Sequence, residues 1–242
     1  MARRHARSIV ALLCLAAVPT RVSAQDADRN VLETIADGVK SVISEDSASL
    51  LTMATALALV ASPFDETLTY SASCSTFLKT SFEGWARVAG QEWVLGSGAL
   101  ATYLIARATD HPKLSAVGGD LMQAQVVAGA TTFVLKHAIR RPRPDGEARS
   151  FPSGHAAGTF AAATVVQRHY GLKGAVPAYT LAVLISGARM QANSHYATDL
   201  IAGATIGILA GRAATFELGG RRVMLAPAVT ESGGLMLSGS MR

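Results

Sequence analysis

The 242-residue sequence has few charged residues, few aromatic residues and almost no cysteine. Charged residues make up 16% of the chain, against about 25% in typical soluble domains, whereas half of the residues are hydrophobic. Aromatic residues contribute only 6%, and the apolar residues are mostly Ala, Leu, Val and Ile, which favours helices over a β-sandwich. Only Cys14 and Cys74 are present, so the chain has no disulfide framework.

The first 24 residues have the pattern of a secretory signal peptide, with an uncleaved membrane anchor as the alternative. Three arginines begin the segment, Ser8–Val18 is apolar, and Val22–Ala24 suits cleavage before Gln25. The segment holds four of the 22 basic residues and none of the 17 acidic ones, which leaves 18 basic and 17 acidic residues. This balance gives no support for nucleic-acid binding. Export without a disulfide framework fits a bacterial envelope protein.

Uncharged stretches of helical length follow one another along most of the remaining chain. We predict an all-α fold, a helical bundle of about six helices with an up-and-down core of four. The predicted regions are the signal peptide (1–24), an N-terminal helical region (25–92), the bundle core (93–217) and a C-terminal tail or hairpin (218–242). The uncharged stretches of the core are Trp93–Ala106, Leu121–Leu135, Ala156–Gln167, Gly174–Ala188 and Leu200–Gly211.

Shorter segments flank this core. Gln25–Glu45 has the spacing of an amphipathic helix, Ser47–Phe64 is uncharged, and a short helix is expected around Phe77–Val88. After residue 216, Val223–Val229 and Leu235–Leu237 are predicted to be two strands around a Gly-containing turn, and an extended tail is the alternative.

Membrane insertion is left open by the lengths of the stretches. A span needs about 20 predominantly apolar residues, and most stretches here have 12 to 15 before a charge. Basic residues at the bundle end that carries Arg168 and Arg212 would suit a cytoplasmic face. Six spans with an external site would start inside, whereas a cleaved signal leaves Gln25 outside. Either Ser47–Phe64 does not cross, or the protein is a soluble or peripheral bundle.

Three short segments within 64 residues carry the chemistry: Lys136-x6-Arg143-Pro144, Pro152-Ser153-Gly154-His155 and Arg189-x5-His195-x3-Asp199. Each segment alone has an ordinary reading, as a solvated basic loop, a Ser-capped helix or a surface His–Asp pair. Four members, however, lie at the ends of uncharged stretches, so an up-and-down bundle places them at the same end: Lys136, His155, Arg189 and Asp199. Such a set can hold a tetrahedral oxyanion, attack its centre and protonate the leaving group.

The remaining basic and histidine residues receive simpler interpretations. Arg140 and Arg141 are expected to meet lipid headgroups or acidic loops. His111, His137 and His169 are expected to be structural or surface residues. No metal-ligand spacing accompanies the histidines.

These segments resemble the signature of the type 2 phosphatidic acid phosphatase superfamily, which includes vanadium haloperoxidases and bacterial nonspecific acid phosphatases. The resemblance covers roughly Leu121–Gly211. Ala188 stands where the family usually has serine before the arginine. Tyr196 follows the second histidine, as in the lipid-phosphatase branch, where soluble acid phosphatases usually carry tryptophan.

The resemblance implies a mechanism without metal or cofactor. His195 would attack phosphorus to form a phosphohistidine, Asp199 would orient it, and His155 would protonate the leaving group and then activate water. The phosphate oxygens would be held by Lys136, Arg143, Arg189, Ser153 and the Gly154 amide.

The leading hypothesis is an exported phosphatase of the inner membrane with a periplasm-facing site, acting on a lipid phosphate or pyrophosphate. Phosphatidic acid, phosphatidylglycerol phosphate, undecaprenyl pyrophosphate and a lipid A phosphate are the candidate substrates. The alternatives are a soluble periplasmic acid phosphatase, a vanadate-dependent haloperoxidase and a non-catalytic binding module.

Overall fold

The computed structural model describes residues 45–76, 78, 80–215, 217–218, 221–229 and 235–241. The signal peptide predicted at 1–24 and most of the helix predicted at 25–45 lie outside the described residues. The chain divides into a unit that spans Lys40–Phe216 and a second one that contains Glu217–Arg242. Each unit is described by itself, and the predicted boundaries at 92/93 and 217/218 stay predictions.

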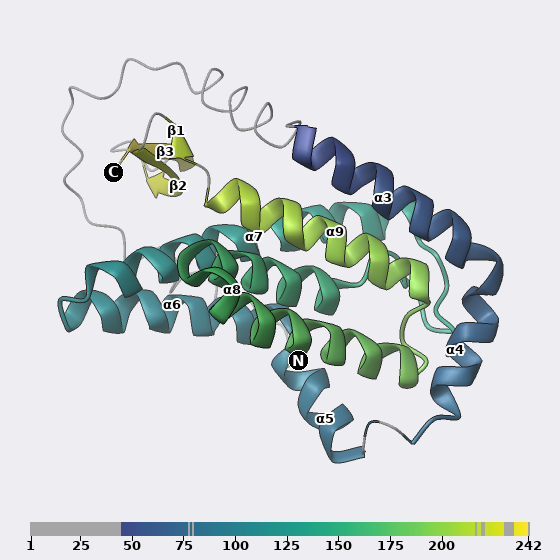
Figure 1. The fold of residues 1–242 in the computed structure, drawn as a ribbon. Helices are drawn as coiled ribbons and strands as arrows, with labels where there is room; N and C mark the ends of the chain where they lie inside the picture. Colours follow the sequence, from purple (N-terminus) through teal and green to yellow (C-terminus); the bar gives the residue numbers. More distant parts are fainter. Residues whose placement is uncertain are drawn as a thin grey trace. The chain divides into compact units, whose positions relative to one another are not determined.

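The larger unit is a bundle of helices, which confirms the predicted all-α class (Figure 1). Each uncharged stretch of the predicted core lies within a helix, and the helices extend beyond the stretches into charged residues. The elements are α3 (Glu45–Ala61), η2 (Ser62–Phe64), α4 (Asp65–Ser73), α5 (Thr80–Ala89), α6 (Glu92–Ala108), α7 (Pro112–Ile139), α8 (Gly154–Gln191) and α9 (Ala197–Ala214).

Helix α8 contains two of the predicted helices, joined by a kink at Gly171. The backbone there has φ 64° and ψ −153°, a conformation that only glycine adopts without strain. The Tyr179 hydroxyl lies 2.8 Å from the Thr164 hydroxyl and donates to the Gln167 side chain at 3.0 Å, so the segments on either side of the kink face each other. Both ends of α8 therefore lie at the same end of the bundle.

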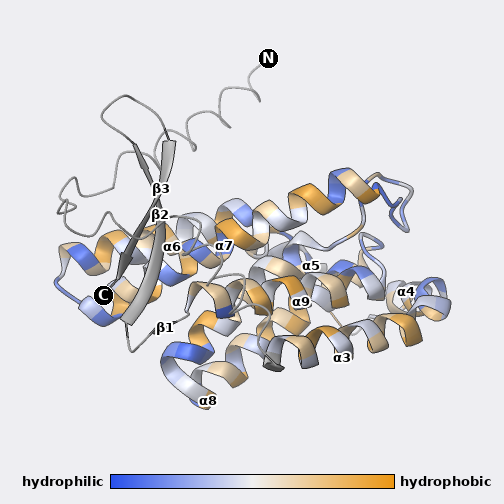
Figure 2. Cartoon of the chain, turned by 90° about the horizontal axis from the view of Figure 1, so that it is seen from above, coloured by the Kyte–Doolittle hydropathy of each residue, from blue (hydrophilic) through white to orange (hydrophobic). Residues whose placement is uncertain are grey.

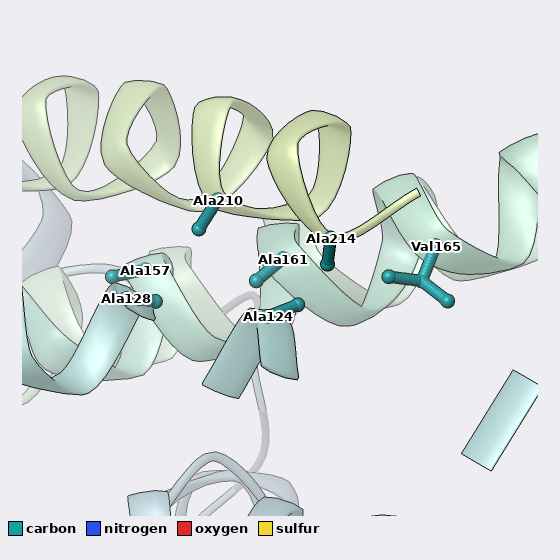
Figure 3. Close-up of a cluster of buried hydrophobic side chains, with 7 residues drawn as sticks. All are labelled: Ala124, Ala128, Ala157, Ala161, Val165, Ala210 and Ala214. Carbon is teal, nitrogen blue, oxygen red and sulfur yellow. The ribbon is translucent and has the colours of Figure 1, made fainter. Parts of the chain in front are cut away.

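Small residues let α7, α8 and α9 approach closely. Their shared core is a cluster of alanines with one valine, drawn in Figure 3: Ala124, Ala128, Ala157, Ala161, Val165, Ala210 and Ala214. Gly203 and Gly207 lie on the α9 face that meets α8. A Cβ at Gly207 would lie 2.3 Å from the Ala157 carbonyl oxygen, and one at Gly203 would lie 2.4 Å from the Ser153 carbonyl oxygen. The glycines thus set the separation of α8 and α9.

Large apolar side chains are exposed on the outside of the bundle rather than collected inside it. Examples are Leu59 and Val60 on α3, Phe133 and Val134 on α7, and Val176 on α8, each more than 60% exposed. Figure 2 shows hydrophobic residues along the lengths of these helices. Among the described residues, Ser47–Ser73 and Gly154–Gln191 are long and apolar enough to cross a membrane by length and composition, and the kink at Gly171 divides the second segment.

The C-terminal strands form an antiparallel sheet in the order β1-β2-β3: Glu217–Leu218, Arg221–Val229 and Leu235–Met241. Strands β2 and β3 pair from Val229 with Leu235 to Val223 with Met241. This is the hairpin predicted from the sequence, and its turn residues 230–234 lie outside the described residues. The short strand β1, which pairs with β2, was not predicted from the sequence.

Candidate active site

All eight predicted site residues lie at one end of the bundle, on the ends of helices and the loops between them. Lys136 is in the last turn of α7, and Arg143 lies in the loop that follows. Ser153, Gly154 and His155 form the start of α8, and Arg189 lies in its last turn. His195 lies in the loop before α9, and Asp199 is in the first turn of that helix. The electrostatic interactions of His195 and His155 reach Lys136, Arg143, Asp199 and Arg189.

His195 is buried and faces the carboxylate of Asp199. Its side chain is 4% exposed, and its Nδ1 lies 3.8 Å from Asp199 Oδ2, longer than a hydrogen bond. Burial lowers the pKa of His195 below its usual 6.5, because desolvation and the nearby Lys136 outweigh the attraction of Asp199 for the charged imidazole. The imidazole is therefore held in its neutral form near pH 7, with Nδ1 turned to the carboxylate and Nε2 left as the outer nitrogen.

Each of the three cationic side chains, Lys136, Arg143 and Arg189, has a partner within the protein. Lys136 Nζ donates to the Arg149 carbonyl at 3.0 Å, and Arg189 Nη2 donates to the Ser194 hydroxyl at 2.7 Å. Arg143 Nη1 lies 3.9 Å from a Glu147 carboxylate oxygen. The Nε atoms of Arg143 and Arg189 are buried and have no hydrogen-bond partner among the described residues. Buried unsatisfied donors of this kind favour an anionic ligand.

The start of α8 brings backbone N–H groups into the site. Ser153 caps the helix, since its hydroxyl accepts from the Ala156 amide at 3.4 Å, and its own amide donates to the Asp199 carbonyl at 3.0 Å. A Cβ at Gly154 would lie 2.7 Å from a carboxylate oxygen of Glu92, so a side chain there would require the Glu92 carboxylate to move. The free N–H groups of the first helical turn, at the positive end of the helix dipole, suit an oxyanion.

His155 is oriented by the backbone of α5. Its Nε2 lies 2.9 Å from the Arg87 carbonyl oxygen, and because a carbonyl oxygen only accepts, Nε2 is the donor. Proton exchange by His155 must therefore use Nδ1.

Asp65, Arg141 and Ser150 belong to the site as well, and sequence reasoning missed them. Arg141 does not point to headgroups: it donates to Asp199 Oδ1 and to Asp65 Oδ2, each at 2.9 Å. The Ser150 hydroxyl donates to Asp199 Oδ2. A sequence signal existed for Asp65, which is the first charged residue after the uncharged stretch Ser47–Phe64. Nothing in the sequence marks Ser150.

Groups of three or more His, Cys, Asp or Glu side chains that could hold a metal ion do not occur in the described part of the chain. The prediction of a mechanism without metal is therefore left to the experiment proposed below.

The fold and the site define a helical bundle with two histidines and three cations at one end, an arrangement that suits an oxyanion. Residues 120–217 match the model of the PAP2 superfamily, so this part of the chain is similar to that family. The match begins at the buried Asp120 of α7 and includes all eight predicted site residues.

Two curated relatives resemble part of the chain. A lipid A 1-phosphatase of Porphyromonas gingivalis is 41% identical over 100 residues, which cover 40% of this chain and 21% of that protein. A lipid A 4'-phosphatase of Helicobacter pylori is 32% identical over 100 residues, or 36% of this chain and 50% of that protein. The matches thus span half or less of these curated relatives.

A solved structure shares the fold. The crystal structure of Aquifex aeolicus LpxE matches with a TM-score of 0.52 and 24% sequence identity, covering 62% of this chain and 92% of that chain. At this identity the likeness concerns the fold alone.

Proposed function

We propose that the chain is a metal-independent phosphatase that hydrolyses a lipid phosphomonoester or pyrophosphate through a phosphohistidine intermediate. The observation that carries the proposal is the buried His195, which faces Asp199, with Lys136 and Arg143 acting on it and Arg189 acting on the neighbouring His155. A neutral imidazole beside three cations is a nucleophile placed against a bound anion.

In the first step, His195 Nε2 attacks phosphorus and the bond from phosphorus to the leaving oxygen breaks. The negative charge of a bound phosphate would offset the surrounding cations and let His155 take up a proton on Nδ1. His155 would transfer that proton to the leaving oxygen, while its Nε2–H stays bound to the Arg87 carbonyl. The developing positive charge on His195 is stabilised by Asp199, and the negative charge on the equatorial oxygens by the cations and the α8 amides.

In the second step, water attacks the phosphohistidine on phosphorus. His155, now neutral, takes the proton of the attacking water on Nδ1, and the bond from phosphorus to Nε2 breaks to release inorganic phosphate. This step restores both histidines to their starting protonation states, so the two steps balance in protons and electrons.

Lipid substrates fit the outer surface of the bundle. If the apolar side chains exposed along α3, α7 and α8 lie in the hydrocarbon, the site at one end of the bundle would be near the headgroups. The named functions of the relatives make a lipid A phosphomonoester the first substrate to test. The proposed location is the inner membrane, with the site on the periplasmic side.

The test is phosphate release by the purified full chain in EDTA, with His195→Ala beside the wild type. Lipid A, phosphatidic acid and undecaprenyl pyrophosphate in mixed micelles are compared with p-nitrophenyl phosphate. We expect EDTA-resistant turnover of a lipid substrate that falls by ~10⁴-fold or more in the variant. An inactive wild type, or equal turnover by the variant, would overturn the proposal. A preference for the soluble ester would favour the acid-phosphatase alternative.

A further inference from the structure

Asp65 is a buried carboxylate at the start of α4, far in sequence from the predicted signature. It is 4% exposed. Its Oδ1 accepts from the Thr198 amide at 3.0 Å, and its Oδ2 accepts from Arg141 Nη2 at 2.9 Å and from the Thr198 hydroxyl. Asp65 thereby connects α4 to the first turn of α9, the turn that also carries Asp199.

Arg141 bridges Asp65 and Asp199 through different nitrogens. Its Nη1 donates to Asp199 Oδ1 at 2.9 Å and to the Thr198 hydroxyl at 2.7 Å, while Nη2 is used by Asp65. The guanidinium also lies 4.2 Å from the centroid of the Tyr196 ring. One cation is thus divided between two buried carboxylates and held against a ring, which fixes its position.

Asp199 has a fully buried side chain, and its other oxygen is the one that faces the nucleophile. Oδ2 accepts from the Tyr196 amide at 2.9 Å and from the Ser150 hydroxyl, and it lies 3.8 Å from His195 Nδ1. The hold of Arg141 on Oδ1 therefore affects both the orientation of the carboxylate and the negative charge it presents to His195.

We propose that Asp65 is a positioning residue of this site: by holding Nη2 of Arg141, it limits the pull of that guanidinium on Asp199 and keeps the Asp199 carboxylate directed at His195. The proposal rests on the proposed function for its effect on turnover. Without Asp65, the guanidinium is free to turn both nitrogens to Asp199, which weakens Asp199 as a partner of His195.

A purely structural role for Asp65, as an anchor of α4 on α9, predicts a different result. Loss of an anchor would lower the melting temperature without a specific change at the imidazole of His195. Loss of a positioning residue would lower kcat at an unchanged KM and shift the titration of His195 to lower pH.

The experiment compares the full-length wild type with Asp65→Asn, Asp65→Glu and Asp120→Asn. Asp120 is a matched control: it is a buried carboxylate 2.6 Å from the imidazole of His169, and it precedes Lys136 on α7 by about 24 Å of helix. The readouts are kcat and KM in EDTA, the melting temperature, and the titration of the His195 imidazole by NMR, assigned with His195→Gln. The charged or titratable groups that act on this imidazole are unchanged in all variants: Asp199, Lys136, Arg143 and His155.

For Asp65→Asn we expect kcat to fall by ~10-fold or more, KM to stay within about twofold, and the His195 midpoint to fall by about half a unit. Asp65→Glu restores part of each value, since it returns the carboxylate. Asp120→Asn alters the melting temperature but neither kcat nor the midpoint.

An unchanged His195 midpoint in a folded Asp65→Asn protein would overturn the proposal. So would equal effects of the Asp65 and Asp120 variants on kcat. Because the NMR titration needs no turnover, a wild type without phosphatase activity would defeat the proposed function and still leave the positioning by Asp65 to be decided by the His195 midpoint.

Discussion

At the scale of single residues, the two histidines are held by different kinds of partner, and the difference matches their proposed roles. His195 faces a carboxylate, which stabilises positive charge on a nucleophile as it bonds to phosphorus. His155 is held by a neutral carbonyl through Nε2, which orients the ring and leaves Nδ1 for proton exchange. The carboxylate beside His195 and the carbonyl beside His155 thus adapt the same residue type to two different proposed roles.

The role of His155 predicts a dependence on the leaving group. An alkoxide leaves poorly without a proton, whereas p-nitrophenolate leaves readily, so loss of the acid should matter more for the first. We expect His155→Ala to lower kcat on a lipid phosphomonoester by ~10²–10⁴-fold and to affect p-nitrophenyl phosphate clearly less. Steady-state rates of wild type and variant on both substrates measure this. Equal losses on the two substrates would contradict an acid role in the first step.

At the scale of helices, the glycines of α9 connect packing to catalysis. Gly207 lies two turns beyond Asp199, at the close contact between α9 and α8, and a methyl group there meets the Ala157 carbonyl. We expect Gly207→Ala to lower the free energy of unfolding by about 1–3 kcal/mol, and to lower kcat because α9 moves its first turn away from His195. Thermal unfolding in detergent and phosphate release measure the two effects.

Gly96→Ala on α6 is the control for this prediction, because nothing lies within 4 Å of a Cβ at Gly96. Alanine is the better helix former, so this change should be neutral or stabilise by about 0.5–1 kcal/mol. If Gly207→Ala and Gly96→Ala lower the free energy of unfolding equally, the close contact between α9 and α8 is not the reason for glycine at position 207.

The helices and most of the site were predictable because they leave local signals in the sequence. Uncharged stretches mark α6, α7, both halves of α8 and α9, and the ends of these stretches carry Lys136, His155, Arg189 and Asp199. The two separate helices predicted here correspond to the segments of α8 on either side of the kink at Gly171. The Arg87 carbonyl and Ser150 leave no signal, because their roles depend on contacts 68 and 49 residues away in sequence. Arg141 was misread, because a basic run alone does not reveal the Asp65 carboxylate that meets it.

At the scale of the whole bundle, orientation in the membrane can be tested with a cysteine that the chain already has. Cys74 is free and exposed after α4. It lies at the site end of the bundle, since the neighbouring Ser75 carbonyl accepts from Gln191 at 2.7 Å, at the end of α8. Ala108, at the end of α6, is exposed and lies beside the start of α7, at the opposite end of the bundle from Lys136.

A periplasm-facing site predicts that a membrane-impermeant maleimide labels Cys74 in intact spheroplasts. Cys74→Ala should abolish the labelling, because Cys14 would be removed with the signal peptide. Ala108→Cys in the Cys74→Ala background should be labelled only after the membrane is disrupted, since this end of the bundle would face the cytoplasm. The reverse pattern would place the site inside. Labelling of both positions in spheroplasts, together with release of the protein by alkaline carbonate, would show a peripheral bundle and contradict the membrane-spanning arrangement that the exposed apolar surface favours.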